Sequence, residues 1–424
     1  MPLQDFKIYM ERCSRCSYCK WVPHMKMTER KFATICPSIA QYEFHGWSAG
    51  GRMVAGLSLL RGRIDYSDTL LDMIYQCQMD GGCDVSCKNQ TDLEPLETML
   101  ELRAKCVRDG HVIRGHMPAI QSLRREDNMM QSPKAERGKW AEGLDVKDIT
   151  KDRVQVLYHA GCRLSFDKEL WNIARGTVSL LRDAGVDIGI MGKEEVCCGG
   201  RAYEWGYQEE LARYAGRNAK AWEASGVKMV VTSCPHCYQT FNVLYDKIGM
   251  RVNVQVLHIT QFLDFLIKEN KLQLIKEVPM EVTYHDPCHL GRLAEPWIRW
   301  NGVEKKVMGQ LIVQDPPKEF RRGANGVYDL PRDLLKSIPG LKLVEMPRIR
   351  EYAWCCGAGG GVKEAYPEFA LRTGLERMKE AETTGAEATV SACPWCQRNL
   401  LDVVKTMDTR MKVYDIVELV QQAL

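Results

Sequence analysis

The sequence predicts an α+α/β protein, in which a helical N-terminal domain precedes two tandem α/β repeats. Two observations carry this prediction. The chain has 424 residues and 18 cysteines, and ten of these cysteines form a five-cysteine pattern that occurs twice. Strand-like and helix-like segments alternate around both copies, whereas the segment between the first cysteines has the apolar spacing of a helix. A chain of this length is long enough for several domains, each with its own core.

Composition narrows the class of protein. Apolar residues make up 45% of the chain and charged residues 27%, as in average soluble proteins. No apolar run approaches the roughly 18 residues of a membrane span, and the first residues lack a basic start followed by an apolar stretch. We therefore expect a cytoplasmic protein with no membrane span. The net charge of +3, without a basic run, gives no sign of a nucleic-acid partner.

The number of cysteines points to metal chemistry. Cytosolic thiols are kept reduced, so cysteine patterns in a chain of this kind more often indicate metal binding or catalysis than disulfides. A disulfide framework is the weaker alternative. The cysteines fall into three groups, one near the N-terminus and one in each repeat.

The N-terminal cysteines have the spacing of a two-cluster ferredoxin. "CSRCSYC" places three cysteines at three-residue intervals, "CP" adds a fourth, and "CQMDGGCDVSC" adds three more. In such ferredoxins the fourth cysteine of each run binds the other cluster. We therefore expect two [4Fe-4S] cubane clusters in a domain over residues 1–115. The expected ligands are Cys13, Cys16, Cys19 and Cys87 for the first cluster, and Cys36, Cys77, Cys83 and Asp80 for the second.

Asp80 stands where the ferredoxin motif has a cysteine, and its role has two interpretations. A carboxylate can replace a thiolate on one iron as a harder and more weakly held ligand. Alternatively, "DGG" is strong turn chemistry, and the second cluster then has an incomplete set of ligands. Thiolate is the ligand that these metals prefer, so the residue types leave both interpretations open.

A helix is predicted between the two N-terminal cysteine runs. In "YSDTLLDMIYQC", Ser67 is a suitable N-cap, and Leu70, Leu71, Ile74 and Tyr75 fall on one helical face. The helix would end at Cys77. This pattern favours an α-helical ferredoxin domain over the small β-rich kind.

The later cysteines repeat one pattern. Each copy has a cysteine after a strand-like segment ("VLYHAGC", "VTYHDPC"), a vicinal pair ("CCGG", "CCGAGGG") and a CPxC motif ("CPHC", "CPWC"). Such similarity at three places indicates an internal duplication. From the first cysteine to the vicinal pair the second copy is longer, so we place an insertion near residues 292–340. The two sets are Cys162, Cys197, Cys198, Cys234 and Cys237, and Cys288, Cys355, Cys356, Cys393 and Cys396.

Strand and helix patterns place these cysteines at one edge of each repeat. "RVQVLYHAG" predicts a strand that ends before Cys162, "DKELWNIARGTVSLLRDAG" a helix that Gly185 stops, and "VDIGIM" and "KMVVTSC" two more strands. Open α/β sheets bind ligands at the carboxyl ends of their strands. We expect the first repeat over residues 153–278, the second over 279–424, and a polar linker over 116–152.

Five cysteines per repeat favour a cluster of several irons. Structural zinc sites close with four tetrahedral ligands, and adjacent cysteines are awkward ligands for one ion. Glycines after the vicinal pair let backbone N–H groups approach the sulfurs. A zinc ribbon made by the CPxC pairs remains the alternative.

The doubled cysteine pattern behind a ferredoxin domain resembles the D subunit of heterodisulfide reductase, which is equivalent to fused C and B subunits. It is also similar to the iron–sulfur subunit of the sulfite-reduction membrane complex and to the electron-transfer subunit of the tungsten-type benzoyl-CoA reductase complex. The resemblance implies two CCG-type repeats, each with a noncubane [4Fe-4S] cluster on its five cysteines. The departures from the family are Asp80, the interrupted run from Cys19 to Cys36, and the insertion in the second repeat.

Two functions follow from this resemblance. In the first, the chain is an electron-transfer subunit of an anaerobic multi-subunit oxidoreductase, and it carries electrons between a flavin-containing heterodisulfide reductase A-like partner and a catalytic subunit such as an acyl-CoA reductase. In the second, it is a catalytic subunit that cleaves a disulfide between the two noncubane clusters. The glycines of "CCGAGGG" do not follow the strand-then-GxGxxG arrangement of a dinucleotide site, so electrons must come from a partner protein.

His159 and His285 occupy matching places before the first cysteine of each repeat. They have two interpretations, as donors of protons or hydrogen bonds to sulfur, or as packed residues at a strand end. We favour packing. We expect Trp354 and Trp395 to exclude water from a cluster, and Cys106, which belongs to neither pattern, to be an ordinary buried thiol.

Overall fold

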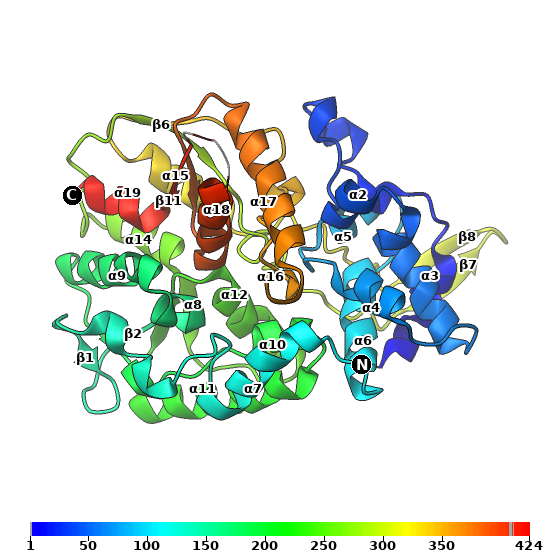
Figure 1. The fold of residues 1–424 in the computed structure, drawn as a ribbon, viewed down its shortest axis with the longest axis horizontal. Helices are drawn as coiled ribbons and strands as arrows, with labels where there is room; N and C mark the ends of the chain where they lie inside the picture. Colours follow the sequence, from blue (N-terminus) through cyan, green and yellow to red (C-terminus); the bar gives the residue numbers. More distant parts are fainter. Residues whose placement is uncertain (1, 407–408, 410) are drawn as a thin grey trace.

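The computed structural model describes residues 2–406, 409 and 411–424. Its N-terminal part is helical, and two parallel sheets follow it (Figure 1). In residues 2–126 the described β-pairing is one isolated bridge between Trp21 and Thr34. The helices of this part are α1 (Lys7–Arg12), α2 (Pro37–Tyr42), α3 (Ala49–Leu60), α4 (Asp68–Tyr75), α5 (Gly82–Cys87), α6 (Pro95–Arg108) and α7 (Met117–Glu126).

The helix predicted before Cys77 is confirmed as α4. The Ser67 hydroxyl accepts a hydrogen bond from the backbone N–H of Leu70 at 3.2 Å, as an N-cap does. Leu70, Ile74 and Tyr75 are buried on one face. The chain leaves α4 at Tyr75 and reaches the half-buried Cys77 two residues later.

The first sheet has five parallel strands in the order β1-β3-β2-β4-β5. Gly185, in the left-handed region at φ +72°, ends the predicted helix α9 as expected. The strands are β1 (Lys147–Asp148), β2 (Val156–His159), β3 (Ile188–Ile190), β4 (Met229–Thr232) and β5 (Gln255–His258). The helices are α8 (Gly161–Phe166), α9 (Trp171–Asp183), α10 (Gly200–Glu204), α11 (Gln208–Ser225), α12 (Pro235–Gln239), α13 (Tyr245–Lys247) and α14 (Ile259–Lys268).

The second sheet has four parallel strands in the order β9-β6-β10-β11. This order matches β3-β2-β4-β5 of the first sheet, so the two repeats share a topology as the duplication predicts. The strands are β6 (Met280–Tyr284), β9 (Leu341–Leu343), β10 (Ala388–Ser391) and β11 (Lys412–Asp415). The helices are α15 (Asp329–Lys336), α16 (Val362–Ala365), α17 (Pro367–Glu382), α18 (Pro394–Thr406) and α19 (Ile416–Gln422).

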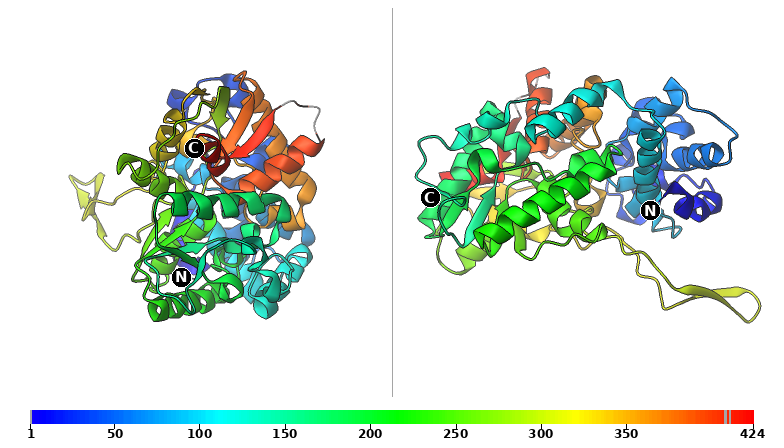
Figure 2. Two further views of the ribbon diagram at one scale, coloured as in Figure 1. Left: turned by 90° about the vertical axis from the view of Figure 1, so that its left-hand side faces the viewer. Right: turned by 90° about the horizontal axis from the view of Figure 1, so that it is seen from below.

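The insertion in the second repeat carries an antiparallel hairpin, β7 (Val303–Val307) and β8 (Leu311–Asp315), that projects from the body of the molecule (Figure 2). By their place in the repeat, α15 and β9 correspond to α9 and β3, so the inserted residues end before Asp329. Arg12 of α1 forms a two-pronged ion pair with Glu304 of the hairpin, with both N–O distances at 3.0 Å.

The repeats share one hydrophobic core. Val156 and Tyr158 of β2 belong to the same buried cluster as Val282 of β6 and Val390 of β10. Residues 116–152, expected as a linker, contain α7 and β1, and β1 pairs with β3. Within the described part of the chain, no helix is both long and apolar enough to cross a membrane.

Candidate functional site

The first candidate site, site 1, lies in the N-terminal part. Its loop wraps around a small cavity with Arg15 and Ser17 in the left-handed backbone region, at φ +61° and +70°. Burial raises the pKa of the Cys87 thiol to about 12, so without a metal this thiol stays protonated at neutral pH. Cys16 is exposed. The cysteines that line the cavity are Cys13, Cys16, Cys19 and Cys87.

Site 2 comprises Cys36, Cys77 and Cys83. Cys36 precedes α2, Cys77 follows α4, and Cys83 lies in α5. Burial, and then the neighbouring thiols of Cys77 and Cys36, raise the pKa of Cys83. Cys19 of site 1 is close enough to add to the raised pKa of Cys36. The two N-terminal sites are neighbours, since the N–H of Ile35, next to Cys36, donates to the carbonyl of Lys20, next to Cys19, at 2.9 Å.

Asp80 is beside site 2, but protein donors hold its carboxylate. One oxygen accepts from the Gly82 N–H at 3.1 Å, and the other pairs with the Arg292 guanidinium at 3.1 Å. The Arg292 Nε also donates to the Asp80 carbonyl at 2.5 Å, and its Nη1 donates to the carbonyls of Glu351 and Ala353, both at 2.8 Å. Both carboxylate oxygens of Asp80 thus have partners within the protein.

Site 3 gathers the five cysteines of the first repeat. They lie after β2, before α10, and around the start of α12, because neighbouring parallel strands end at the same edge of the sheet. Hydrogen bonds from the thiols of Cys197 and Cys237 lower the pKa of Cys198 to about 5. The Gly199 N–H lies 3.4 Å from the Cys197 sulfur. The buried Arg137 donates to the Cys162 sulfur at 3.6 Å.

Site 4 repeats this arrangement with the cysteines of the second repeat. Hydrogen bonds from the thiols of Cys355 and Cys396 lower the pKa of Cys356 to about 6. The Gly357 N–H lies 3.3 Å from the Cys355 sulfur. In both repeats the second cysteine of the vicinal pair is therefore the more acidic thiol of the pair, and a backbone N–H approaches the first.

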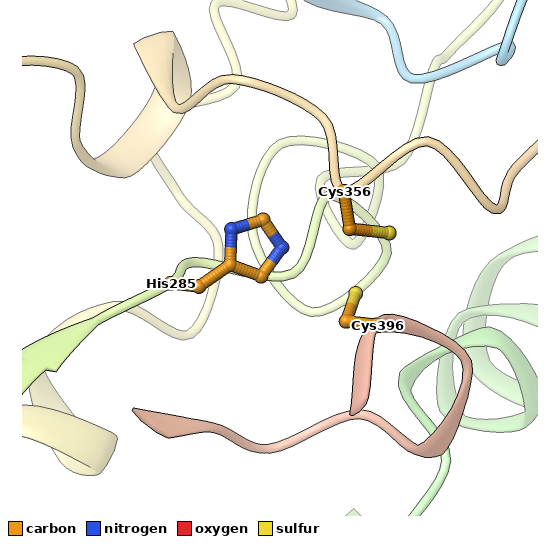
Figure 3. A group of neighbouring side chains, drawn as sticks. All are labelled: His285, Cys356 and Cys396. Carbon is orange, nitrogen blue, oxygen red and sulfur yellow. The ribbon is translucent and has the colours of Figure 1, made fainter. Parts of the chain in front are cut away.

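His285 belongs to site 4. It follows β6 and faces Cys356 and Cys396, with one ring nitrogen and the two sulfurs within 4.8 Å of one another (Figure 3). Its Nδ1 accepts from the Arg377 Nε at 3.0 Å, and its Nε2 has no partner among the described residues. Burial, and then the charge of Arg377, lower the pKa of His285 to about 3. A neutral ring with Nδ1 as acceptor carries its proton on Nε2, which points to the sulfurs.

His159, the matching residue of the first repeat, lies differently. Its ring packs edge-on against Phe241, with ring centroids 5.0 Å apart. Glu195 lies 3.6 Å from its Nδ1, but neither ring nitrogen has a hydrogen bond within the described part. The packing interpretation fits His159 better than it fits His285.

An aromatic and charged layer fills the space between sites 3 and 4. Trp395, from the CPWC motif of site 4, lies between two guanidinium groups. Its ring centroid is 4.0 Å from the Arg163 Cζ and 3.7 Å from the Arg201 Cζ. Arg163 follows Cys162 of site 3. Arg201 also forms a two-pronged ion pair with Glu364, with both distances at 2.7 Å. The layer is therefore made by residues next to the motif cysteines.

The CPHC motif of site 3 makes the reciprocal contact. His236 stacks on His289, the residue after Cys288, with ring centroids 4.0 Å apart. His289 lies 3.2 Å from the Cys288 sulfur and 2.6 Å from a Glu204 oxygen. Burial opposes protonation of His289, but Cys288 and Glu204 raise its pKa to about 10. Because the two rings are stacked, one metal ion cannot lie in the plane of both, so we assign His236 and His289 to the layer rather than to a metal site.

Sites 2 and 4 meet through backbone. Any side chain on Gly359 or Gly360 would collide with the carbonyl groups of Gln78 or Cys77. The buried Arg103 clamps this contact, since it donates to the Gly360 carbonyl at 2.7 Å and to the Cys77 carbonyl at 2.8 Å. The glycine run of "CCGAGGG" thus allows the N-terminal part to approach the second repeat closely.

Sequence reasoning missed the charged residues that support these sites. Arg137 comes from the segment expected as a linker and Arg292 from the start of the expected insertion, and Arg163 and Arg201 had no predicted role. The one available signal was position, because Arg163 and His289 directly follow the first cysteine of their repeats. Arg292 gave no such signal, since its partner Asp80 is 212 residues away.

Comparisons with known proteins agree with the doubled pattern. The family model of the cysteine-rich domain, CCG, matches residues 156–242 and 319–401. The first range contains all of site 3. The second contains all of site 4 except Cys288, which precedes the hairpin.

Curated relatives match almost the whole chain. The D subunit of dihydromethanophenazine:CoB–CoM heterodisulfide reductase is 30% identical over 427 residues in Methanosarcina barkeri and 29% over 433 residues in Methanosarcina mazei. Each alignment covers 98% of this chain and 94% of the relative. The EtfAB:quinone oxidoreductase of Syntrophomonas wolfei is 28% identical over 373 residues, which are 83% of this chain and 47% of that protein.

The residues present fit iron–sulfur clusters. Each site has three or more converging thiols, and sites 3 and 4 add N–H donors aimed at sulfur, as clusters require. A structural zinc ion closes with four ligands, which leaves one thiol of each five-cysteine set unused.

Proposed function

Because the chain belongs to the iron–sulfur protein family of the heterodisulfide reductase D subunit and is an oxidoreductase subunit, we propose that it is the electron-transfer subunit of an anaerobic complex. In this proposal residues 1–115 form an α-helical ferredoxin domain with cubane [4Fe-4S] clusters at sites 1 and 2. The two repeats hold noncubane [4Fe-4S] clusters at sites 3 and 4. Clusters bound at these sites would take up and release single electrons. The chain would thereby connect a flavin-containing partner with a catalytic subunit.

The observation that carries this proposal is the order of the four sites. Site 1 neighbours site 2, because the N–H of Ile35, next to Cys36, donates to the carbonyl of Lys20, next to Cys19, at 2.9 Å. Site 2 neighbours site 4 through the backbone contact of Cys77 with Gly360, and site 4 neighbours site 3 through Trp395. These contacts connect site 1 to site 2, site 2 to site 4 and site 4 to site 3. The N-terminal part also contacts the first repeat directly, where Arg103 donates to the Glu204 carbonyl at 3.2 Å.

The filled layer between sites 3 and 4 also favours a relay. Trp395, His236 and His289 are each less than 10% exposed, and Arg201 is 5% exposed. A substrate that reacts between these sites would have to displace stacked and ion-paired side chains. Electron transfer needs no such opening.

We infer that site 2 differs from a complete cubane site. Three cysteines converge there, and the carboxylate at the fourth motif position is held by Arg292 and the Gly82 N–H. Of the two interpretations of Asp80, these contacts support the turn residue over the iron ligand.

A second candidate function is catalytic cleavage of a disulfide between sites 3 and 4. One observation favours it: the layer contains buried polar atoms without hydrogen bonds to described residues, on Arg163, Arg201, Glu204 and His236. Such groups are rare in interiors unless a ligand or water satisfies them. The two Methanosarcina relatives are subunits of an enzyme named as a CoB–CoM heterodisulfide reductase, so a thiol or disulfide is the ligand to test.

The experiment is iron, sulfide and zinc analysis with EPR spectroscopy on anaerobically purified protein. Cys356→Ser should remove one noncubane signal and spare the signals of the N-terminal clusters. Cys106→Ser, which changes a buried thiol outside the four sites, is the matched control and should leave all signals intact. Zinc in place of iron, or loss of every signal in Cys356→Ser, would contradict independent cluster sites.

The same samples separate the two functions. Coenzyme M or its mixed disulfide with coenzyme B would alter the EPR signal of a disulfide-active centre, because sulfur ligation changes the surroundings of the iron. Unchanged signals would support the relay.

A further inference from the structure

We propose that the surface around Cys16 is the docking site of an acidic, one-electron carrier protein. This inference rests on the proposed function, because it requires a redox cluster at site 1. We call the surface the basic rim and define it by five cations of the loop that carries Cys16 and Cys19 and of the loop that follows. They are Arg15, Lys20, Lys26, Arg30 and Lys31.

Site 1 is where a proposed cluster ligand meets solvent. Cys16 is exposed, and each of the other 17 cysteines is buried or partly buried. In the order of contacts described above, site 1 is the first site and site 3 is the last. A partner that exchanges electrons with this protein would therefore bring its own cofactor closest to these sites at Cys16.

The rim is strongly cationic. Residues 14–31 contain five lysines and arginines and one acidic residue, Glu29. Lys20 is partly buried and the other four cations are exposed. The cations Lys20, Lys26, Arg30 and Lys31 form no ion pair with a described residue. The nearby Arg12, by contrast, is paired with Glu304. The rim therefore carries a net positive charge, and Glu29, Glu345 and Glu351 line one surface pocket with Lys26.

The loop that carries these charges leads from site 1 to the second repeat, and it is anchored at both ends. The Ile35 N–H donates to the Lys20 carbonyl at 2.9 Å, which holds the base of the loop beside site 2. The Thr28 hydroxyl donates to the Pro347 carbonyl of the second repeat at 3.1 Å. His45 lines the cavity of site 1, and burial, followed by the charges of Lys20 and Arg15, lowers its pKa.

Exposed apolar side chains lie among the cations. Tyr18 is 38% exposed, Trp21 43% and Met25 90%. Aromatic residues, methionine and arginine are the residue types enriched at the centres of protein interfaces. A basic surface with aromatic contacts around a redox ligand fits a carrier whose acidic surface surrounds its own cofactor, because opposite potentials guide the two into a productive encounter.

An anionic membrane would also attract cations and aromatic side chains. The position of Cys16 favours a protein. A lipid surface against the rim would cover the exposed cysteine of site 1, whereas a carrier protein would place a redox group there.

The test measures the rate of electron transfer from a small acidic bacterial ferredoxin to the full-length protein, in wild type and in a rim variant. The ferredoxin is reduced first, and the two proteins are then mixed anaerobically in a stopped-flow instrument. The rim variant is Lys20→Gln/Lys26→Gln/Arg30→Gln/Lys31→Gln. At low salt we expect its second-order rate constant to fall about 10-fold or more, the order of electrostatic steering. The wild-type rate should fall toward the variant's as NaCl is added, because salt screens exposed charges.

A matched control removes the same charge elsewhere. Lys271, Lys276, Lys336 and Lys342 are exposed, near α14 and α15 at the far end of the molecule from α2 (Figure 1). Their replacement by Gln should leave the rate close to wild type. Equal losses in rim and control variants, or no loss in the rim variant, would overturn the docking site.

Two further measurements identify the cause of a failure. Titanium(III) citrate needs no docking surface, so it should reduce wild type and rim variant alike. If neither protein shows a reducible iron signal, the proposed function fails; normal reduction without a charge effect refutes the docking site alone. Vesicles of phosphatidylglycerol that bind wild type but not the rim variant, with ferredoxin rates unchanged, would instead assign the rim to a membrane and overturn the proposal.

Discussion

Gly360 offers a direct test of the contact between sites 2 and 4. A Cβ added at this residue would lie 2.8 Å from the Gln78 carbonyl carbon and closer still to the Cys77 carbonyl oxygen. Both atoms are backbone, so no side chain can rotate away. Gly360→Ala must therefore separate the N-terminal part from the second repeat, or distort one of them.

The size of the effect follows from the same geometry. The contact to Gln78 is about 0.6 Å shorter than the 3.4 Å at which ordinary van der Waals contact begins, and overpacking of this kind costs roughly 1–3 kcal/mol. Gly360 also has φ +57°, where an L-residue costs roughly 1–2 kcal/mol. We expect a total destabilisation of about 2–5 kcal/mol.

Gly385→Ala is the matched control. Gly385 has φ +76°, but an added Cβ would meet nothing within 4 Å, so it carries the backbone cost of roughly 1–2 kcal/mol alone. The assay compares melting temperatures of the anaerobic proteins and, by freeze-quench EPR, the time that electrons take to spread from the N-terminal signals to the noncubane signals. Gly360→Ala should melt lower than Gly385→Ala and show slower spreading, because tunnelling weakens with distance. Identical behaviour of the two variants would refute the proposed link between sites 2 and 4.

Two further predictions concern buried charge. Asp80→Asn should lower the melting temperature, because an unpaired Arg292 in the interior costs about 3–5 kcal/mol. The double variant Asp80→Asn/Arg292→Met should recover much of this loss. An unchanged melting temperature in Asp80→Asn would show that the fold does not need the ion pair. Burial lowers the pKa of His258 from 6.5 to about 3, so the unfolded chain takes up a proton first as pH falls. His258 therefore stabilises the fold above pH 6.5, and this contribution declines between pH 6.5 and about 3 by about 1.4 kcal/mol per pH unit. His258→Asn keeps an N-cap acceptor for α14, and it should weaken the fall of the melting temperature with decreasing pH. Replacement of the exposed His24 by Asn should leave this fall unchanged. Equal pH profiles for the two variants would contradict the role of His258.

The sequence alone predicted the parts that depend on local pattern. The strand before Cys162, the helix with Ser67 as its N-cap, and the stop at Gly185 follow from residue types a few positions apart, and the structure contains all three. The duplication was readable because matching motifs recur in the same order, and both sheets have the corresponding strand order. Parallel strands then place the cysteines that follow them at one edge, whatever the details of packing.

The tertiary structure alone decided how these parts meet. The residue types left two interpretations of Asp80 open, and only the structure places its carboxylate against Arg292, 212 residues away. Trp395 was expected to exclude water, and the structure adds that two guanidinium groups of the first repeat enclose it. No local pattern encodes such contacts, because they depend on the relative placement of segments that are distant in the chain. The residue types and spacings therefore determined which sites this protein can build, and long-range packing determined their order and the charges that surround them.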